Sequence, residues 1–440
     1  MDACIGFGVR VRVCVERVVQ CRSKKRIEDH DHSFIGRHRR TVCAHSIPMS
    51  MASTSTSTLR CADVRRVASA RCGRGRGRKS HHGRLGCAEP STSCVSEERA
   101  VEFVDARVRW RGHDVHYVRC GSTRAAKHVL LLPGFGVGAF HYEALSRGLG
   151  AEDDTCVWAI DFVGQGESWP SEGDAAEVGF RYSVETWAEQ VEFFLREVVQ
   201  TECFLVGNSL GGYVSTLVAA RSRSLVRGLM LLNATPFWAF VPNDPNSIGS
   251  RIAPWRGELP APKWISGLIS TYWQSFRSEA NVRGLLSLVY SNPSVIDDEL
   301  VRNIIKPTDN ANALSTFCSV VWSPKSALSF DEMLERIRAD DSLPVALMYG
   351  KEDPWVVPLW GQRLKRAVPR ADYYEISPCG HCPAHERPET LNDLISSYMS
   401  YCHAGKSGEP PRGSTDGFAS LVDGSPRNIF ERIDALRAAA

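Results

Sequence analysis

Short apolar runs that each end in a turn recur along the body of this chain. They read "HVLLLPG" (128–134), "TCVWAID" (155–161), "ECFLVGNS" (202–209), "RGLMLLNAT" (227–235), "PVALMYG" (344–350) and "ADYYEIS" (371–377). Continuous apolar runs of this length are typical of strands buried on both faces, as in a parallel sheet. Helical patterns lie between several of them; in the segment 183–199 the apolar residues recur every three to four positions, and Ser183 is placed to cap the helix. The alternation predicts an α/β fold with a mostly parallel, doubly wound sheet.

Two segments depart from this alternation of strands and helices. Residues 101–121 alternate apolar and polar side chains, which predicts an antiparallel hairpin ahead of the parallel strands. The interval 236–330 is rich in Trp, Phe and Tyr and has a helical pattern interrupted by Pro and Gly. Because it lies between the fourth and fifth apolar runs, we expect an inserted helical lid over the strand ends. Most of its aromatic side chains would fill the lid's own core, and only two or three would face a ligand.

Composition divides the chain into three parts. Residues 1–96 hold 19 Lys and Arg against 7 Asp and Glu, and from Met49 this leader is rich in Ser, Thr, Ala and Arg. That composition cannot form a core and is typical of an organelle transit peptide, although an undirected disordered tail is the alternative. We expect translation to begin at Met49 or Met51. Residues 97–402 form the predicted folded domain, and 403–440 a mostly flexible tail.

Charge and cysteine usage limit the functional classes. The chain after residue 96 holds 34 basic and 43 acidic residues, and an acidic body argues against nucleic acid as a partner. No apolar run reaches the roughly 18 residues that a transmembrane helix needs. The seven cysteines of the body are scattered apart from Cys379 and Cys382, which favours a reducing compartment over a disulfide scaffold.

The third run leads into "GNSLGG", where Ser209 lies between two glycines and a helical pattern follows. A strand, then G-x-S-x-G, then a helix is the pattern of a nucleophile elbow. The serine must adopt a strained turn, and side chains at positions 207 and 211 would collide with neighbouring backbone. Ser209 is therefore the predicted nucleophile, at a helix N-terminus whose dipole favours developing negative charge.

A serine nucleophile needs a base, and the base needs an orienting acid. Asp353 follows the apolar run 344–350, and His381 follows the run 371–377, so both lie just past strands and after the serine. We predict that Asp353 and His381 complete a catalytic triad. The rival acids are Asp161 and Glu352, and the rival base is His385.

The oxyanion formed during acyl transfer also needs hydrogen-bond donors. The predicted donors are the backbone N–H groups of Leu210, directly after the nucleophile, and of Phe135, in the glycine-rich turn after the first run. That turn lacks the Lys-Ser/Thr of a P-loop and the G-x-G-x-x-G spacing, so we do not expect nucleotide binding.

The tetrapeptide Cys379-Gly380-His381-Cys382 matches the C-x-x-C of dithiol oxidoreductases. Its flanking prolines and its late position in a long sheet argue against that activity. Redox control of the loop that carries His381 is kept as a hypothesis.

Six segments resemble one known family. They are "LPGFGVGAFHYE", "VWAIDFVGQGESWP", "GNSLGGYV", "LLNATPFWAF", "LMYGKEDPWVVPLWG" and "YYEISPCGHCPAHERPE". From about 129 to 395 the chain is similar to the pheophytinase family, plastid α/β-hydrolases that cleave the phytyl ester of Mg-free chlorophyll. The resemblance implies an α/β-hydrolase fold with its lid inserted before the last strands, and a triad of Ser209, His381 and Asp353.

The same resemblance implies pheophytin or a related phytylated tetrapyrrole as substrate, pheophorbide and phytol as products, no metal, no cofactor and a chloroplast location at the stroma or thylakoid surface. The expected substrate contacts are Phe237, Trp238 and Trp355, since flat aromatic surfaces suit a tetrapyrrole and an isoprenoid chain. Peripheral contact with the thylakoid membrane or with chlorophyll-breakdown enzymes is a further expectation. Cys379 stands where the family usually has alanine, which leaves fine substrate preference open.

Two alternatives remain at this point. A chlorophyll dephytylase or a plastid lipid esterase would use the same triad. A non-catalytic ligand-binding protein would keep the fold without turnover, and the intact set of Ser209, Asp353 and His381 argues against it.

Overall fold

The structure, a computed structural model, describes residues 101–169, 182–234, 263–321, 326–406, 409–411 and 418–421. The predicted leader of residues 1–96, its proposed start at Met49 or Met51, and the substrate contacts Phe237 and Trp238 lie outside the described residues.

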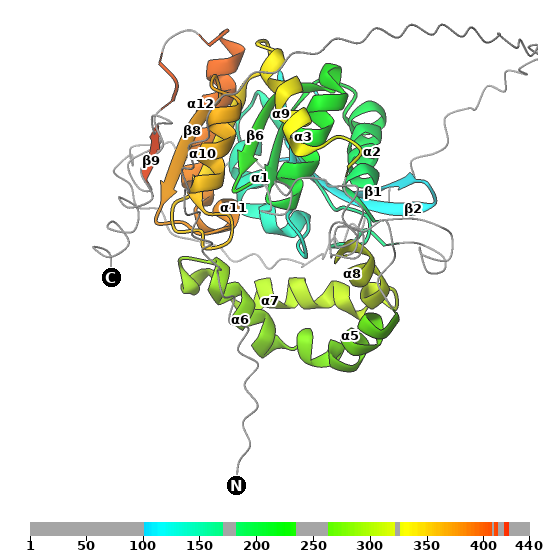
Figure 1. Cartoon of the computed structure of the whole chain (residues 1–440). Coiled ribbons are helices and arrows are strands. Elements are labelled where there is room, and N and C mark those ends of the chain that lie inside the picture. The colour runs from blue at the N-terminus through cyan, green and yellow to red at the C-terminus, as the bar shows by residue number, and fades with distance from the viewer. Residues whose placement is uncertain are drawn as a thin grey trace, which may run out of the picture. The chain divides into compact units, whose positions relative to one another are not determined.

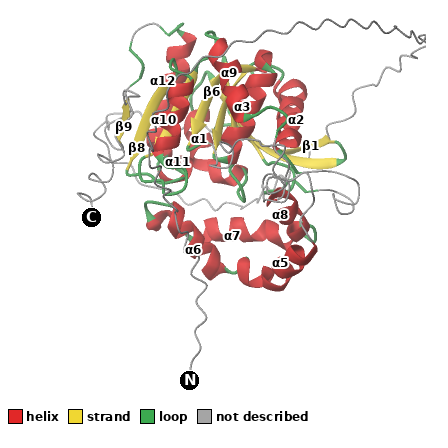
Figure 2. Ribbon diagram, viewed as in Figure 1, coloured by secondary structure: helices red, strands yellow, loops and turns green. Residues whose placement is uncertain are grey.

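One sheet dominates the described part of the chain (Figures 1 and 2). Its strands are β1 (Phe103–Trp110), β2 (His113–Cys120), β3 (Lys127–Leu132), β4 (Thr155–Ile160), β5 (Cys203–Asn208), β6 (Val226–Leu232), β7 (Val345–Gly350), β8 (Asp372–Ser377) and β9 (Phe418–Leu421). Their spatial order is β1-β2-β4-β3-β5-β6-β7-β8-β9. The pairs from β4 through β8 are parallel, whereas β1 with β2, β2 with β4, and β8 with β9 are antiparallel.

This sheet confirms the predicted α/β class and its mostly parallel character. The hairpin predicted in 101–121 is β1 and β2, joined in register from Phe103 opposite Cys120 to Trp110 opposite His113. The final strand, β9, falls inside the segment 403–440 that was expected to be mostly flexible, and the sequence did not predict it. A short edge strand takes its hydrogen bonds from its neighbour β8, so its own residues carry little signal.

Helices cover the sheet and form the insertion. They are α1 (Glu143–Gly150), α2 (Val184–Phe194), α3 (Leu210–Arg221), α5 (Lys263–Phe276), α6 (Glu279–Val289), α7 (Asp298–Ile305), α8 (Ala313–Val321), α9 (Phe330–Ala339), α10 (Pro358–Ala367), α11 (Pro383–Glu386) and α12 (Pro388–His403). Helix α2 begins behind Ser183, whose Oγ accepts a hydrogen bond from the Thr186 N–H at 3.2 Å, as the sequence predicts. Helices α5 to α8 lie between β6 and α9 in the chain and gather into one group (Figure 1).

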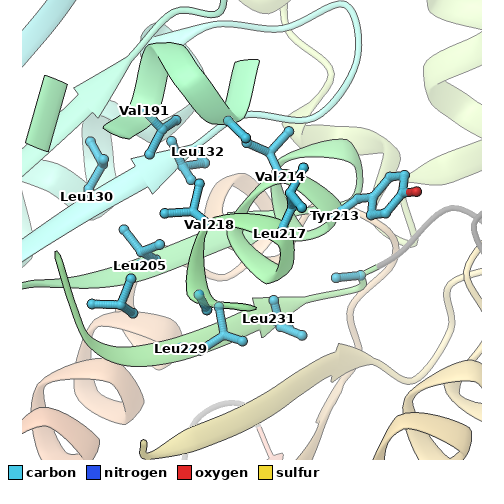
Figure 3. Close-up of a cluster of buried hydrophobic side chains, with 14 of the residues drawn as sticks. Leu130, Leu132, Val191, Leu205, Tyr213, Val214, Leu217, Val218, Leu229 and Leu231 are labelled. Carbon is cyan, nitrogen blue, oxygen red and sulfur yellow. The ribbon is translucent and has the colours of Figure 1, made fainter. Parts of the chain in front are cut away.

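The core has two layers, one on each face of the sheet. Leu130 and Leu132 of β3 belong to the layer formed with α2, α3, α9 and α10, part of which Figure 3 shows. Val129 and Leu131 of the same strand belong to the opposite layer, formed with α1 and α12. Successive side chains of a strand point to opposite faces, which explains why these strands are apolar throughout.

The order of the strands also explains where a site can form. From β3 the chain moves to β4 on one side and later to β5 on the other, so the loops after β3 and β5 diverge at the carboxyl edge of the sheet. Ligands of open α/β sheets bind at such a point. In the described part of the chain, no helix is both long and apolar enough to cross a bilayer.

Candidate active site

Ser209 occupies a sharp turn between β5 and α3. Its backbone has φ 50° and ψ −113°, a region that non-glycine residues rarely adopt and that costs about 1–3 kcal/mol. A Cβ on Gly211 would lie 2.1 Å from the carbonyl oxygen of Leu132, and one on Gly207 would lie 2.4 Å from that of Gly211. Both glycines are therefore required by close backbone packing, as the sequence predicts.

The glycine-rich turn after β3 lies beside the serine. A Cβ built on Gly134 would be 3.6 Å from the Ser209 Cβ, so the backbone that leads into Phe135 runs next to the elbow. The following Gly136 N–H donates to Oε1 of Gln165 at 2.5 Å, which holds the turn. Leu210 is the first residue of α3, and its N–H has no acceptor within the helix. The two predicted oxyanion donors thus lie on the segments that flank Ser209.

Asp353 and His381 form a buried hydrogen-bonded pair. The His381 Nδ1 lies 2.6 Å from Oδ2 of Asp353, and both residues are largely removed from solvent. A carboxylate only accepts hydrogen bonds, so Nδ1 carries the proton. The other ring nitrogen, Nε2, is then left with a free lone pair, as a general base requires.

Four donors converge on the Asp353 carboxylate. Oδ1 accepts from the N–H groups of Trp355 (2.7 Å) and Val356 (3.0 Å), and Oδ2 accepts from Nδ2 of Asn233 (2.7 Å) as well as from His381. Burial by itself would raise the pKa of Asp353, but the hydrogen bond and charge of His381 and the backbone donors outweigh it and lower that pKa. The carboxylate is therefore kept ionised.

Two further contacts hold the backbone of His381. Its carbonyl oxygen accepts a hydrogen bond from Nδ2 of Asn208 at 3.0 Å, which joins the residue before Ser209 to the loop after β8. Its N–H donates to the carbonyl oxygen of Val289 at the end of α6. The nucleophile elbow and the helical insertion thus both position this histidine.

Glu386 strengthens the contact between the insertion and this loop. Its Oε2 accepts from the N–H (2.9 Å) and Oγ (2.7 Å) of Ser291 and from the N–H of Asn292 (3.3 Å). Its Oε1 accepts from the N–H of Gly380, directly before His381, at 2.9 Å. The side chain is buried, so a single carboxylate satisfies donors of both segments away from water.

The rival acids have other partners. Asp161 accepts hydrogen bonds from the N–H groups of Ala139 (2.5 Å) and Glu167 (2.7 Å) and pairs with Nδ1 of His116 (2.9 Å), so it shapes neighbouring loops. Glu352 is exposed and accepts from the Ser377 hydroxyl. Neither carboxylate hydrogen-bonds to His381.

The rival base, His385, belongs to a buried aromatic cluster. Its ring stacks on that of His141 with centroids 4.9 Å apart, and Nε2 of His141 lies 2.7 Å from the Tyr290 hydroxyl. Burial lowers the pKa of His141 to about 3, and the nearby His385 and His381 add to the effect. The His141 imidazole is therefore neutral at physiological pH, and it packs between the segment after β3 and the insertion.

The cysteines that flank His381 are both free and buried. Burial raises the pKa of Cys379 and of Cys382, so both thiols stay protonated. Since the thiolate is the reactive form, these cysteines do not have the environment of a dithiol oxidoreductase. Among the described residues, no group of three or more His, Cys, Asp and Glu side chains could hold a metal ion.

The structure therefore brings most of the predicted site residues to one edge of the sheet. The Trp355 ring lies against that of His381, with centroids 5.9 Å apart. Asn208, Asn233 and Glu386 also belong to the site and were not predicted from the sequence. Asn233 could have been found, because it directly follows β6 just as the other site residues follow their strands.

Comparisons with known proteins agree with this geometry. Residues 129–394 match the alpha/beta hydrolase family. Over 335 residues the chain is 39% identical to the chloroplastic pheophytinase of Arabidopsis thaliana, with 70% of this chain and 69% of that protein covered. Among solved structures, a putative lipase from Acinetobacter baumannii superposes with a TM-score of 0.52 at 19% identity (69% of this chain, 93% of the other). The epoxide hydrolase CorEH superposes with a TM-score of 0.51 at 18% identity (68% and 99%). The two structures show the shared fold, and the sequence matches show that this chain is a hydrolase of the α/β hydrolase family and, within it, of the pheophytinase family.

Proposed function

We propose that this chain is a serine carboxylic-ester hydrolase that cleaves the phytyl ester of pheophytin to pheophorbide and phytol. The observation that carries the proposal is the buried hydrogen bond between His381 and Asp353, which leaves Nε2 of the histidine as a base at the edge where the Ser209 elbow lies. Membership of the pheophytinase family supports the choice of ester.

In the first half of the reaction, Ser209 Oγ attacks the ester carbonyl carbon while His381 Nε2 accepts the hydroxyl proton. The backbone N–H groups of Leu210 and Phe135 stabilise the negative charge that develops on the carbonyl oxygen. When the tetrahedral intermediate collapses, the bond to the phytyl oxygen breaks and the imidazolium returns its proton to that oxygen. Phytol leaves, and the acyl group remains on the serine.

In the second half, water attacks the acyl carbon and gives a proton to His381 Nε2. Collapse breaks the bond between the acyl carbon and Ser209 Oγ, which takes the proton back from His381. Pheophorbide leaves as the carboxylic acid and loses its own proton to solvent, and the free enzyme is restored. The Asp353 carboxylate holds the Nδ1–H tautomer and balances the transient imidazolium charge. Because it already accepts four hydrogen bonds, it needs no rearrangement during the reaction.

The test is product analysis with purified protein and three separate substrates: pheophytin, chlorophyll and a galactolipid. The proposal expects pheophorbide and phytol from pheophytin, with the Ser209→Ala variant inactive. Preferential release of phytol from chlorophyll would instead identify a dephytylase, and preferential release of fatty acid a lipid esterase. No turnover of any ester would favour a ligand-binding protein.

We also propose a chloroplast location, at the stroma or thylakoid surface, since the Arabidopsis relative is named as chloroplastic. Import into isolated chloroplasts, followed by N-terminal sequencing of the processed protein, would test it. A mature N-terminus between about residues 85 and 100 is expected, and a chain that is neither imported nor processed would contradict it.

A further inference from the structure

Helix α5 has an unusual composition for an exposed helix. It runs from Lys263 to Phe276, and no charged residue occurs from 264 to 276. An exposed helix of a soluble protein normally presents charged side chains on its outer face. Here the helix instead contains two Trp, two Ile, one Leu, one Tyr and one Phe.

The apolar side chains of α5 are exposed along one stripe. Four residues spaced by four positions keep large exposed fractions: Trp264 72%, Leu268 53%, Tyr272 61% and Phe276 44%. At 3.6 residues per turn, this spacing places them along one side of the helix. We name these four residues the α5 stripe. Trp273, on another side, stacks on Phe276 and contacts Phe317 of α8, so the stripe meets the inward-packing face at its Phe276 end.

One end of the α5 stripe leads to the candidate active site through aromatic contacts. The Phe276 ring lies 5.3 Å from that of Phe317, and Phe317 lies 5.8 Å from Phe135. Phe135 is the predicted oxyanion residue, next to Gly134 and the Ser209 elbow. Three aromatic rings in contact therefore connect the stripe with the turn that flanks Ser209, and an apolar substrate leaving the stripe would meet them.

The size of the surface decides what can cover it. A 14-residue helix is about 21 Å long and about 10 Å wide, so its exposed side offers roughly 200 Å². A stable dimer needs about 800 Å² from each partner, so a second copy of this chain is not the occupant. The helix is also shorter than the roughly 30 Å of a bilayer's hydrocarbon core, so it would lie along a membrane surface rather than cross it.

We propose that the α5 stripe docks on the surface of a lipid bilayer and delivers bilayer-dissolved substrate to Ser209. An interfacial helix inserts its apolar face at the boundary between headgroups and acyl chains, where Trp and Tyr are favoured. The inference rests on the proposed function, because a long isoprenoid ester partitions into membranes and has to be taken from them.

Charge adds a specific expectation about the lipid. Residues 263–321, which include α5 to α8, contain five basic and five acidic side chains, so this part of the insertion has no net charge. Attraction to anionic headgroups therefore contributes little, and apolar insertion accounts for binding. Docking should be as strong on uncharged phosphatidylcholine vesicles as on vesicles with anionic lipid, and nearly independent of salt.

The experiment compares the full-length protein with two variants. Leu268→Lys/Tyr272→Lys places charge in the centre of the stripe, and both positions are exposed, so folding should be retained. Gln274→Lys adds charge at an exposed position on the other flank of the same helix and is the matched control. Flotation with phosphatidylcholine vesicles is measured without substrate at low and high salt. Phytyl-ester hydrolysis is then measured with substrate in detergent micelles and with substrate embedded in vesicles.

The proposal expects the double variant to lose vesicle binding by about tenfold or more. It should keep its rate on micelles and lose its rate on vesicles, while Gln274→Lys behaves like the wild type. Unchanged vesicle binding by the double variant, or no binding by the wild type, would overturn the proposal. A wild type found to be dimeric by sedimentation, with a monomeric double variant, would also overturn it, because the stripe would then bind a second copy of the chain. Vesicle binding that depends on the stripe, without hydrolysis in either form, would support docking and contradict the proposed function.

Discussion

The backbone N–H of His381 donates a hydrogen bond to the carbonyl oxygen of Val289 at 2.8 Å. The predicted base is therefore held by the last residue of α6, a helix of the insertion, and not only by the sheet. The two residues are 92 positions apart in the sequence, and Glu386 reinforces their contact by accepting from Ser291 and Gly380 on either side. The position of α6 should consequently affect the rate of the chemical step.

Replacing Glu386 tests this coupling. All the groups that donate to its carboxylate are N–H or O–H groups, so Glu386→Gln would place an amide donor against at least one of them. We expect a loss of about 1–3 kcal/mol in the free energy of unfolding and a fall in kcat that exceeds any change in KM. Glu389→Gln, an exposed change three residues later, is the control for both measurements. A destabilised variant with wild-type kcat would show that Glu386 supports the fold alone.

The Ser209→Ala variant should lose activity with little loss of stability. The proposed mechanism has no other nucleophile, so kcat for phytyl esters should fall by about 10³-fold or more. The thermal midpoint should change little, because the substitution removes one oxygen and keeps the backbone conformation. Ser397→Ala, an exposed change on α12, is the control. Retained turnover in Ser209→Ala would contradict the assignment of the nucleophile.

The pKa of Asp353 leads to a pH dependence of stability. The pKa of Asp353 is lower in the folded state than in the unfolded state. The carboxylate therefore stabilises the fold at pH values above its unfolded pKa of about 4, and this contribution is lost as the pH falls from there through the folded-state pKa. The free energy of unfolding of Asp353→Asn should therefore decline less than that of the wild type as the pH drops below about 4. Its kcat should also be strongly reduced, since an amide does not select the Nδ1–H tautomer of His381.

Asp341→Asn is the matched control for this titration, because the Asp341 side chain is 96% exposed. Chemical denaturation at several pH values measures the difference. If the wild type and Asp353→Asn lost stability in parallel between pH 5 and the acid limit, the lowered pKa would be contradicted.

His116 should give the opposite pH dependence. Burial alone would lower its pKa, but the hydrogen bond and charge of Asp161 outweigh it and raise the pKa above 6.5. A raised folded-state pKa stabilises the protein fully below 6.5, and this contribution is lost as the pH rises through the folded value. His116→Gln should thus be less stable than the wild type at pH 6, with a smaller difference at pH 9. His403→Gln changes an exposed imidazole and serves as control; a constant difference across this range would count against the His116–Asp161 ion pair.

The strands β3 to β8 were predictable because a strand buried on both faces must be apolar throughout, and each lies largely within one of the six apolar runs. The alternating pattern of residues 101–121 predicted β1 and β2. The positions of Ser209, Asp353 and His381 could be predicted because each lies one to four residues past the end of such a strand. Asn208 and Glu386 were harder to predict, because their roles depend on contacts with residues distant in the sequence. Asn233 has an identifiable position directly after β6, but its partners are equally distant. Nδ2 of Asn233 donates a hydrogen bond to Asp353, and its Oδ1 accepts one from the N–H of Gly350; both partners are more than one hundred positions away in the sequence. Nothing in the local sequence of Glu386 indicates that Ser291 will lie against it.

Trp355 should affect substrate affinity more than chemistry. Its ring is 54% exposed and lies beside the His381 ring, whereas its contact with Asp353 is made by the backbone N–H, which any residue retains. We expect Trp355→Ala to raise KM for phytyl esters about two- to tenfold, by loss of an aromatic contact. Its kcat/KM for a small soluble ester such as p-nitrophenyl acetate should stay near that of the wild type, because the relay from Asp353 to His381 is intact.

Steady-state kinetics with both esters measures this difference, and Leu359→Ala, an exposed apolar change on α10, is the matched control. A KM effect confined to the phytyl ester would place the Trp355 ring against the substrate, since only the large substrate can reach it from the reacting carbonyl. An equal fall in kcat for both esters would contradict this role. It would mean that the ring packs His381 into its catalytic position, so that its loss disturbs the base itself.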